Sequence, residues 1–132
     1  MIFVDTSVWS LALRRDEPPN IAEVHRFSEA LERGEVVGSG MVLQELLQGT
    51  SGPAQPLALR EAFRSISLVR PRIADHVDAA EVANRCRRGG VQITSVDALL
   101  ATLCIRRGLP MLTTDQDFTH LARHAPLELW AP

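Results

Sequence analysis

The chain of 132 residues contains no lysine, so all 14 of its Lys/Arg positions are arginines. The absence of lysine excludes a P-loop ATPase, in which a Lys amine holds the phosphates. It also excludes Schiff-base chemistry, which forms on a Lys amine. Arginine suits bidentate phosphate contacts, although a genome-wide preference for Arg codons is the plainer explanation of this usage.

Cysteines and long apolar runs are also scarce. The two cysteines, Cys86 and Cys104, lack metal-ligand spacing and lie in helix-like patterns, where a free thiol usually serves as a small buried hydrophobe. No apolar run approaches the ~20 residues that span a membrane. Asp5 interrupts the apolar N-terminus, which argues against a signal peptide. A reduced, cytoplasmic protein without a membrane segment is therefore expected.

Length and charge limit the remaining possibilities. A chain of this size is expected to form a single domain, residues 1–132. The formal net charge of −2 argues at first against a nucleic-acid partner. If several acids belong to one site, however, the rest of the surface is net positive, and a nucleic-acid partner stays possible.

Short apolar runs alternate with helical patterns along the chain. A helix is expected between Asn20, as N-cap, and Gly34, as C′ stop. The alternation predicts an α/β fold with a mostly parallel sheet covered on both faces. Its functional crevice would lie beyond the carboxyl ends of the strands. Strands are expected at residues 2–4, 36–37, 67–69, 111–112 and 127–130, with a ladder pair at 92–93, and other helices at 6–15, 41–48, from 56, 73–88, 96–107 and 118–124.

Five acidic residues fall next to these strand ends or within apolar helices. Asp5 ends the first strand, and Asp115 and Asp117 follow the strand at 111–112. Glu45 lies in the helix after the second strand, and Asp97 in the first turn of the most apolar helix. Because parallel strands end at one edge of a sheet, these carboxylates are expected to converge on one crevice.

Such a cluster is electrostatically unfavourable without a cation. Two carboxylates about 5 Å apart repel by roughly 3 kcal/mol at an effective dielectric constant of ~20. The cluster must raise its pKa values or bind metal. Oxygen ligands favour Mg²⁺, Mn²⁺ or Ca²⁺ over Zn²⁺, and a pair of such ions stabilises in-line displacement at phosphorus.

Each acid also has a purely structural interpretation. Asp5 and Asp115 are possible helix caps, and Asp97 is a possible capping-box partner of Thr94. Glu45 would then be an ordinary exposed helix acid. A separate alternative is the D-x-D-x-T pattern at 115–119, which resembles the nucleophile loop of haloacid-dehalogenase-type phosphatases. That family places the motif on its first strand and uses a downstream Lys, which this chain lacks.

Four segments in order resemble the motifs of PIN-domain ribonucleases, and the length is similar to VapC-type toxins of bacterial toxin–antitoxin systems. The segments are residues 2–9 (IFVDTSVW), 44–49 (QELLQG), 95–101 (SVDALLA) and 112–118 (LTTDQDF). The resemblance implies a three-layer α/β/α sandwich and Mg²⁺- or Mn²⁺-dependent cleavage of single-stranded RNA.

The resemblance also assigns roles. Asp5, Asp97 and Asp115 would be the direct metal ligands, Glu45 would act through a metal-bound water, and Asp117 would be a fifth acid. Hydroxyls of Thr6 and Thr113 would orient the cluster, and Thr114 stands where such toxins often carry Asn. A homodimer and a cognate antitoxin are further implications. The alternative is a catalytically silent PIN-like module whose acidic groove holds a basic partner.

An RNA substrate would also need a basic rim around the crevice. Arg14 and Arg15, near the end of the first helix, are candidate phosphate contacts. Arg87 and Arg88, at the end of the helix at 73–88, are the other two candidates.

Overall fold

A computed structural model describes residues 1–13 and 17–132, and in these residues four short strands form one parallel sheet. The strand order is β3-β2-β1-β4. Every neighbouring pair is parallel, as the alternation of strands and helices predicts. The strands are β1 (Ile2–Val4), β2 (Val36–Gly38), β3 (Ser67–Leu68) and β4 (Met111–Leu112).

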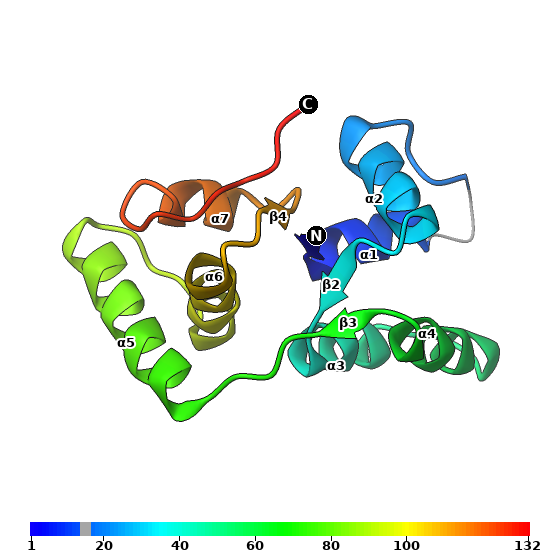
Figure 1. Ribbon diagram of the computed structural model, residues 1–132, viewed down its shortest axis with the longest axis horizontal. Coiled ribbons are helices and arrows are strands. Elements are labelled where there is room, and N and C mark those ends of the chain that lie inside the picture. The colour runs from blue at the N-terminus through cyan, green and yellow to red at the C-terminus, as the bar shows by residue number, and fades with distance from the viewer. Residues whose placement is uncertain (14–16) are drawn as a thin grey trace.

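Helices connect the strands and flank the sheet. Figure 1 shows α1, α2 and α4 towards the right, α3 below β2 and β3, and α5 to α7 on the left of the strands. This arrangement agrees with the expected α/β architecture and its helical layers around a central sheet. The helices are α1 (Thr6–Ala12), α2 (Ala22–Glu32), α3 (Gly40–Gln48), α4 (Ala54–Arg64), α5 (Ile73–Arg88), α6 (Ser95–Arg107) and α7 (Gln116–Leu121).

The core lies on β1 and on the helices beside it. All three residues of β1 are buried, as expected for the central part of a parallel sheet. On α1, the buried Trp9 ring packs edge-on against Phe27, with centroids 4.6 Å apart, and stacks on Phe63 at 4.8 Å. These aromatic contacts join α1, α2 and α4, so the first turn of α1 is held firmly at the end of β1.

A buried ion pair fixes α5 against α6. Asp75, in the first turn of α5, is only 1% exposed. Its carboxylate accepts hydrogen bonds from both terminal nitrogens of Arg107, at 3.1 and 3.0 Å, and contacts Arg106 Nε at 2.9 Å. The Arg107 guanidinium lowers the pKa of Asp75 to about 2. This contact anchors the helix that carries Asp97.

Three local expectations are wrong. Residues 127–130 form a single parallel bridge, Met111–Leu129, rather than a strand, and residues 92–93 have no strand pairing within the described chain. The N-cap of α2 is Ile21, with no side-chain cap hydrogen bond. Asn20 instead bonds the His25 ring through its side-chain oxygen, so the side chain expected to cap the helix has another partner.

None of the described helices is long and apolar enough to cross a bilayer.

Candidate active site

Two neighbouring parallel strands bring Asp5 and Thr113 to one edge of the sheet. Val4 of β1 is in register with Leu112 of β4, and the Asp5 backbone N–H donates to the Leu112 carbonyl at 3.0 Å. The residues that follow each strand, Asp5 and Thr113, therefore emerge side by side. Asp5 is 5% exposed, a low value for a carboxylate.

Hydroxyl groups fix the buried Asp5 carboxylate. Its Oδ2 accepts hydrogen bonds from Ser7 Oγ at 2.8 Å and from Thr113 Oγ1 at 2.9 Å. Ser7 Oγ in turn accepts from the Thr114 backbone N–H at 3.0 Å. The ends of β1 and β4 are thus joined through side chains, and one carboxylate oxygen is held in a defined position.

Asp115 and Asp117 are placed by the start of α7. The Asp115 backbone N–H donates to Thr113 Oγ1 at 3.0 Å, which extends the hydroxyl network. The Asp115 side chain accepts from the Asp117 backbone N–H at 2.9 Å and so caps the helix. The capping interpretation of Asp115 is therefore correct, but a cap uses one carboxylate oxygen and leaves the other available.

The start of α6 brings Asp97 to the same place. Thr94 caps this helix, and its hydroxyl accepts from the Asp97 backbone N–H at 3.1 Å. Because the cap uses the backbone of Asp97, the Asp97 carboxylate remains available. Oxygens of Asp97, Asp115 and Asp117 all lie within 4.8 Å of one another. Three carboxylates from two helix N-termini thus form one compact group.

Burial and neighbouring charges perturb Asp97. Desolvation, together with repulsion from Asp5 and Asp115, raises the pKa of Asp97 to about 6, and Glu45 adds a smaller repulsion. A hydrogen bond from Thr94 opposes the increase. Ionisation of Asp97 is therefore less favourable in this site than in water, and a bound cation would favour it.

Glu45 approaches from α3, the helix that follows β2. Its Oε1 accepts a hydrogen bond from Thr6 Oγ1 at 3.1 Å. The carboxylate is exposed and close enough to affect the charge of Asp97. Thr6 and Thr113 therefore both contact acids of the cluster, as the resemblance implies.

All five predicted acids lie in one region, but they are not equivalent. The compact group consists of Asp97, Asp115 and Asp117, whereas Asp5 borders it with one oxygen held by hydroxyls. The donor set contains only oxygen, and among the described residues it is the one group of three such side chains close enough to hold an ion. This chemistry fits Mg²⁺ or Mn²⁺.

Ser7 is a site residue that the sequence did not single out. Its hydroxyl donates to Asp5 and accepts from the Thr114 backbone, so it connects the two strand ends. The available signal was its position two residues after Asp5, where a hydroxyl can bond back to a helix-capping carboxylate. Thr114 joins this hydrogen-bond network through its backbone N–H, a group that any residue except proline provides.

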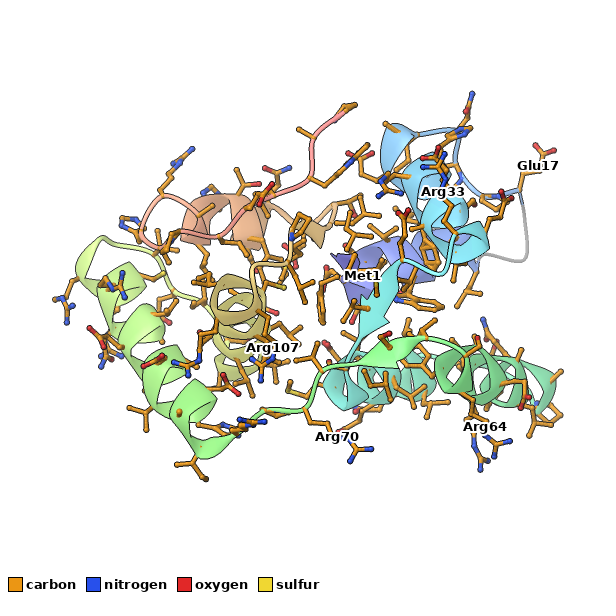
Figure 2. All side chains as sticks on the ribbon, in the orientation of Figure 1. Met1, Glu17, Arg33, Arg64, Arg70 and Arg107 are labelled. Carbon is orange, nitrogen blue, oxygen red and sulfur yellow. The ribbon has the colours of Figure 1, made fainter. Side chains whose placement is uncertain are left out.

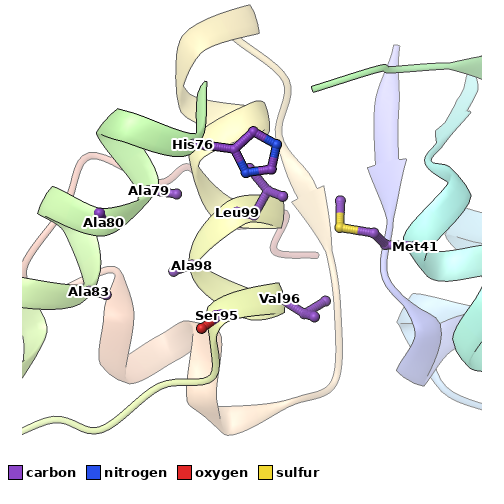
Figure 3. Close-up of a pocket in the computed structure, with 9 residues that line it drawn as sticks. All are labelled: Met41, His76, Ala79, Ala80, Ala83, Ser95, Val96, Ala98 and Leu99. Atoms are coloured by element: carbon purple, nitrogen blue, oxygen red, sulfur yellow. The ribbon is translucent and has the colours of Figure 1, made fainter. Parts of the chain in front are cut away.

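The cavity between α3, α5 and α6 lies outside this group (Figure 3). Its volume is about 330 Å³, and most of its lining is apolar. His76 and Ser95 contribute polar atoms, and Met41 faces them from the opposite side. No carboxylate lines this cavity, so the cluster at the sheet edge is the better candidate for chemistry.

The predicted arginine contacts are only partly located. Arg14 and Arg15 lie outside the residues that the structure describes. Arg87 and Arg88 are exposed in the last turn of α5. Their role in RNA binding stays a prediction.

Comparison with known proteins supplies an independent result. The model of the PIN domain family matches residues 2–124. Ribonuclease VapC11 of Mycobacterium tuberculosis is 27% identical over 132 residues, which cover 97% of this chain and 96% of the relative.

Solved structures share the fold. A DNA-bound VapBC structure from Salmonella typhimurium has a TM-score of 0.74 at 18% identity, covering 98% of each chain. The sarcin–ricin loop cleaving toxin VapC20 of Mycobacterium tuberculosis has a TM-score of 0.63 at 20% identity, covering 90% of this chain and 93% of that one.

Proposed function

Because the chain belongs to the PIN domain family, we propose that it is a metal-dependent endoribonuclease that cleaves single-stranded RNA. The main observation behind this proposal is the group of Asp97, Asp115 and Asp117. Their carboxylate oxygens lie within 4.8 Å of one another, beside the buried Asp5. Relatives that align over nearly the whole chain are named ribonucleases, which supports the same reaction class.

The three clustered aspartates are the residues that would hold Mg²⁺ or Mn²⁺, together with the adjoining Asp5. The raised pKa of Asp97 supports this assignment, because bound positive charge would offset the repulsion that raises it. Such an ion, when bound, would act as a Lewis acid on a phosphoryl oxygen and stabilise the negative charge that develops there.

The protein's own contribution is to fix these groups in advance. Ser7 and Thr113 hold one oxygen of Asp5, and the caps of α6 and α7 orient Asp97 and Asp115. Thr6 holds Oε1 of Glu45. The second oxygen of this exposed glutamate can orient an attacking water and accept its proton.

We further infer the biological setting. Solved neighbours include VapBC complexes, so this chain would be the toxin of a toxin–antitoxin pair, acting as a homodimer in the cytoplasm. A cognate antitoxin would occupy the acidic groove. The alternative of a silent binding module requires only negative charge, whereas here hydroxyls and helix caps hold individual carboxylates in fixed positions.

The test is cleavage of an end-labelled single-stranded RNA with Mg²⁺ or Mn²⁺, with and without excess EDTA. Internal cuts should need the metal, and Asp97→Asn should abolish them. Asp78→Asn is the matched control, because Asp78 is a partly buried aspartate outside the acid cluster and pairs with Arg106 on the α5–α6 face.

Two outcomes would contradict the proposal. Undiminished cleavage in EDTA would show that the reaction does not require a metal ion. Hydrolysis of small phosphomonoesters without cutting of RNA would favour the phosphatase alternative at 115–119.

A further inference from the structure

A group of basic side chains lies where the end of α5 meets the turn after α7. α5 contributes Arg85, Arg87 and Arg88 from its last turn. His120 lies in the last turn of α7, and Arg123 and His124 follow it. Figure 2 shows nitrogen-tipped side chains around this outer end of α5 and around the neighbouring turn. These six residues are called the basic corner below.

Direct contacts hold the two halves of the basic corner together. Arg85 donates a hydrogen bond to the His124 carbonyl at 3.5 Å. The His124 ring lies directly against Gly89. A Cβ atom added to residue 89 would be 2.2 Å from this ring. Positive charges 35 residues apart in sequence, on Arg88 and Arg123, are therefore brought to one surface by packing.

Acidic partners do not neutralise these arginines. In the described part of the chain, the ion pairs of arginine involve Arg26, Arg33, Arg64, Arg106 and Arg107. Arg85, Arg87, Arg88 and Arg123 form none of them, and all four are exposed. Exposed guanidinium groups without carboxylate partners are free to form bidentate contacts with phosphates.

Two short segments connect the basic corner to the acid cluster. In α7, Asp117 lies in the first turn and His120 in the last, about 4.5 Å apart along the axis at 1.5 Å per residue. From Gly89, residues 90–93 lead to Thr94, which caps the helix that carries Asp97. The basic corner therefore lies at the opposite end of α7 from Asp117, one short helix away from the proposed metal site.

We propose that the basic corner binds backbone phosphates of the RNA strand next to the cleavage site, an inference that rests on the proposed nuclease function. A phosphodiester chain that reaches three clustered carboxylates must be held by positive charge elsewhere. The basic corner offers that charge on the Asp117 side of the cluster. An acidic segment of a protein partner is the competing occupant, but it would not explain why the charge lies one short helix away from the acid cluster.

The test compares two triple variants that remove equal charge. In the first, called the corner variant, Arg87, Arg88 and Arg123 are changed to Gln. Arg60, Arg70 and Arg72 are changed to Gln in the control, because these arginines are also exposed and form no ion pair within the described residues. Arg72 precedes the first turn of α5, at the opposite end of that helix from Arg88.

Binding is measured by fluorescence anisotropy with a labelled single-stranded RNA oligonucleotide in EDTA, over a range of salt. The corner variant should bind roughly tenfold or more weakly, and its slope of log affinity against log salt should be shallower by about 2, at ~0.7 per lost phosphate contact. The control should keep a slope closer to wild type. A triple Arg→Lys variant of the corner should regain most of the affinity, since it restores the charge.

Cleavage with Mn²⁺ separates this inference from the nuclease function. The corner variant should raise KM and leave kcat near the wild-type value, because it leaves the acids intact. Equal RNA binding and equal KM in the two triple variants would overturn the inference, even if the wild-type protein cuts RNA. Corner-dependent RNA binding without any cleavage would support the inference and contradict the nuclease function.

Discussion

Replacement of Asp97 by Asn should stabilise the metal-free protein. Desolvation and the nearby carboxylates raise the pKa of Asp97 from 3.8 to about 6, a shift of about 2 units. At 1.36 kcal/mol per unit this corresponds to about 3 kcal/mol, and solvent screening of a partly exposed group reduces it to about 1–3 kcal/mol. The Thr94 cap survives, because it binds the backbone N–H of residue 97.

The stabilisation of the metal-free protein by Asp97→Asn should increase with pH. A carboxyl whose folded pKa is raised imposes no penalty below its unfolded pKa of about 4, and the full penalty above about 6. Asp97→Asn should therefore melt above wild type at pH 7.5 in EDTA and close to it at pH 4. With an unfolding entropy of ~0.3 kcal/mol per degree for this chain length, the increase in Tm is about 3–10 °C.

Bound metal should reverse the order of the melting temperatures, so that wild type melts above Asp97→Asn. Binding stabilises wild type by RT ln(1 + [L]/Kd), roughly 2.7 kcal/mol at a hundredfold excess over Kd, and Asp97→Asn should lose most of this. The assay is thermal unfolding of wild type, Asp97→Asn and the Asp78→Asn control in EDTA and in Mn²⁺. If Asp97→Asn melts below wild type by the same amount at both pH values and with both additives, the residue is only a structural cap.

Three further predictions concern the scaffold. Asp75→Asn should lower the free energy of unfolding at pH 7 by about 2–4 kcal/mol in urea titrations, since it removes the partner of two arginines. Because the folded pKa of Asp75 is lowered to about 2, this wild-type advantage should vanish as pH falls from about 4 to 2, and a constant difference would contradict the ion-pair assignment. Burial raises the pKa of the Cys86 and Cys104 thiols, so iodoacetamide at pH 8 should label them only in denaturant, and fast native labelling would refute their burial. Gly38→Ala should destabilise the protein by about 1–3 kcal/mol, because the added Cβ lies 2.9 Å from Ile66 Cδ1; an unchanged urea midpoint would show that the Ile66 side chain shifts freely.

Sequence patterns predicted the parts of the fold that short-range physics determines. The apolar runs at β1 and β4 are buried because both faces of a parallel sheet are covered. Acids placed directly after such runs must emerge at the same edge, so the positions of Asp5 and Asp115 were predictable. The end of α5 at Arg88 was predictable as well, since Gly89 and Gly90 follow it.

Other features depend on contacts between distant residues, which no local pattern specifies. The ion pair of Asp75 and Arg107 joins residues 32 positions apart, and nothing in either segment indicates the partner. Ser7 belongs to the site because two strand ends meet beside it, whereas most serines near a helix start only cap it. Residues 127–130 have an apolar strand pattern, but they gain only one bridge to β4.

The central claim is that the clustered carboxylates hold a divalent metal which RNA cleavage requires. The most direct measurement is a Mn²⁺ titration of one preparation, with bound metal followed by electron paramagnetic resonance and initial RNA cleavage rate measured at each point. The rate should rise in proportion to bound Mn²⁺ in wild type and in Asp78→Asn, and Asp97→Asn should lose both signals. Cleavage by metal-free protein, or equal Mn²⁺ binding by Asp97→Asn and Asp78→Asn, would contradict the claim.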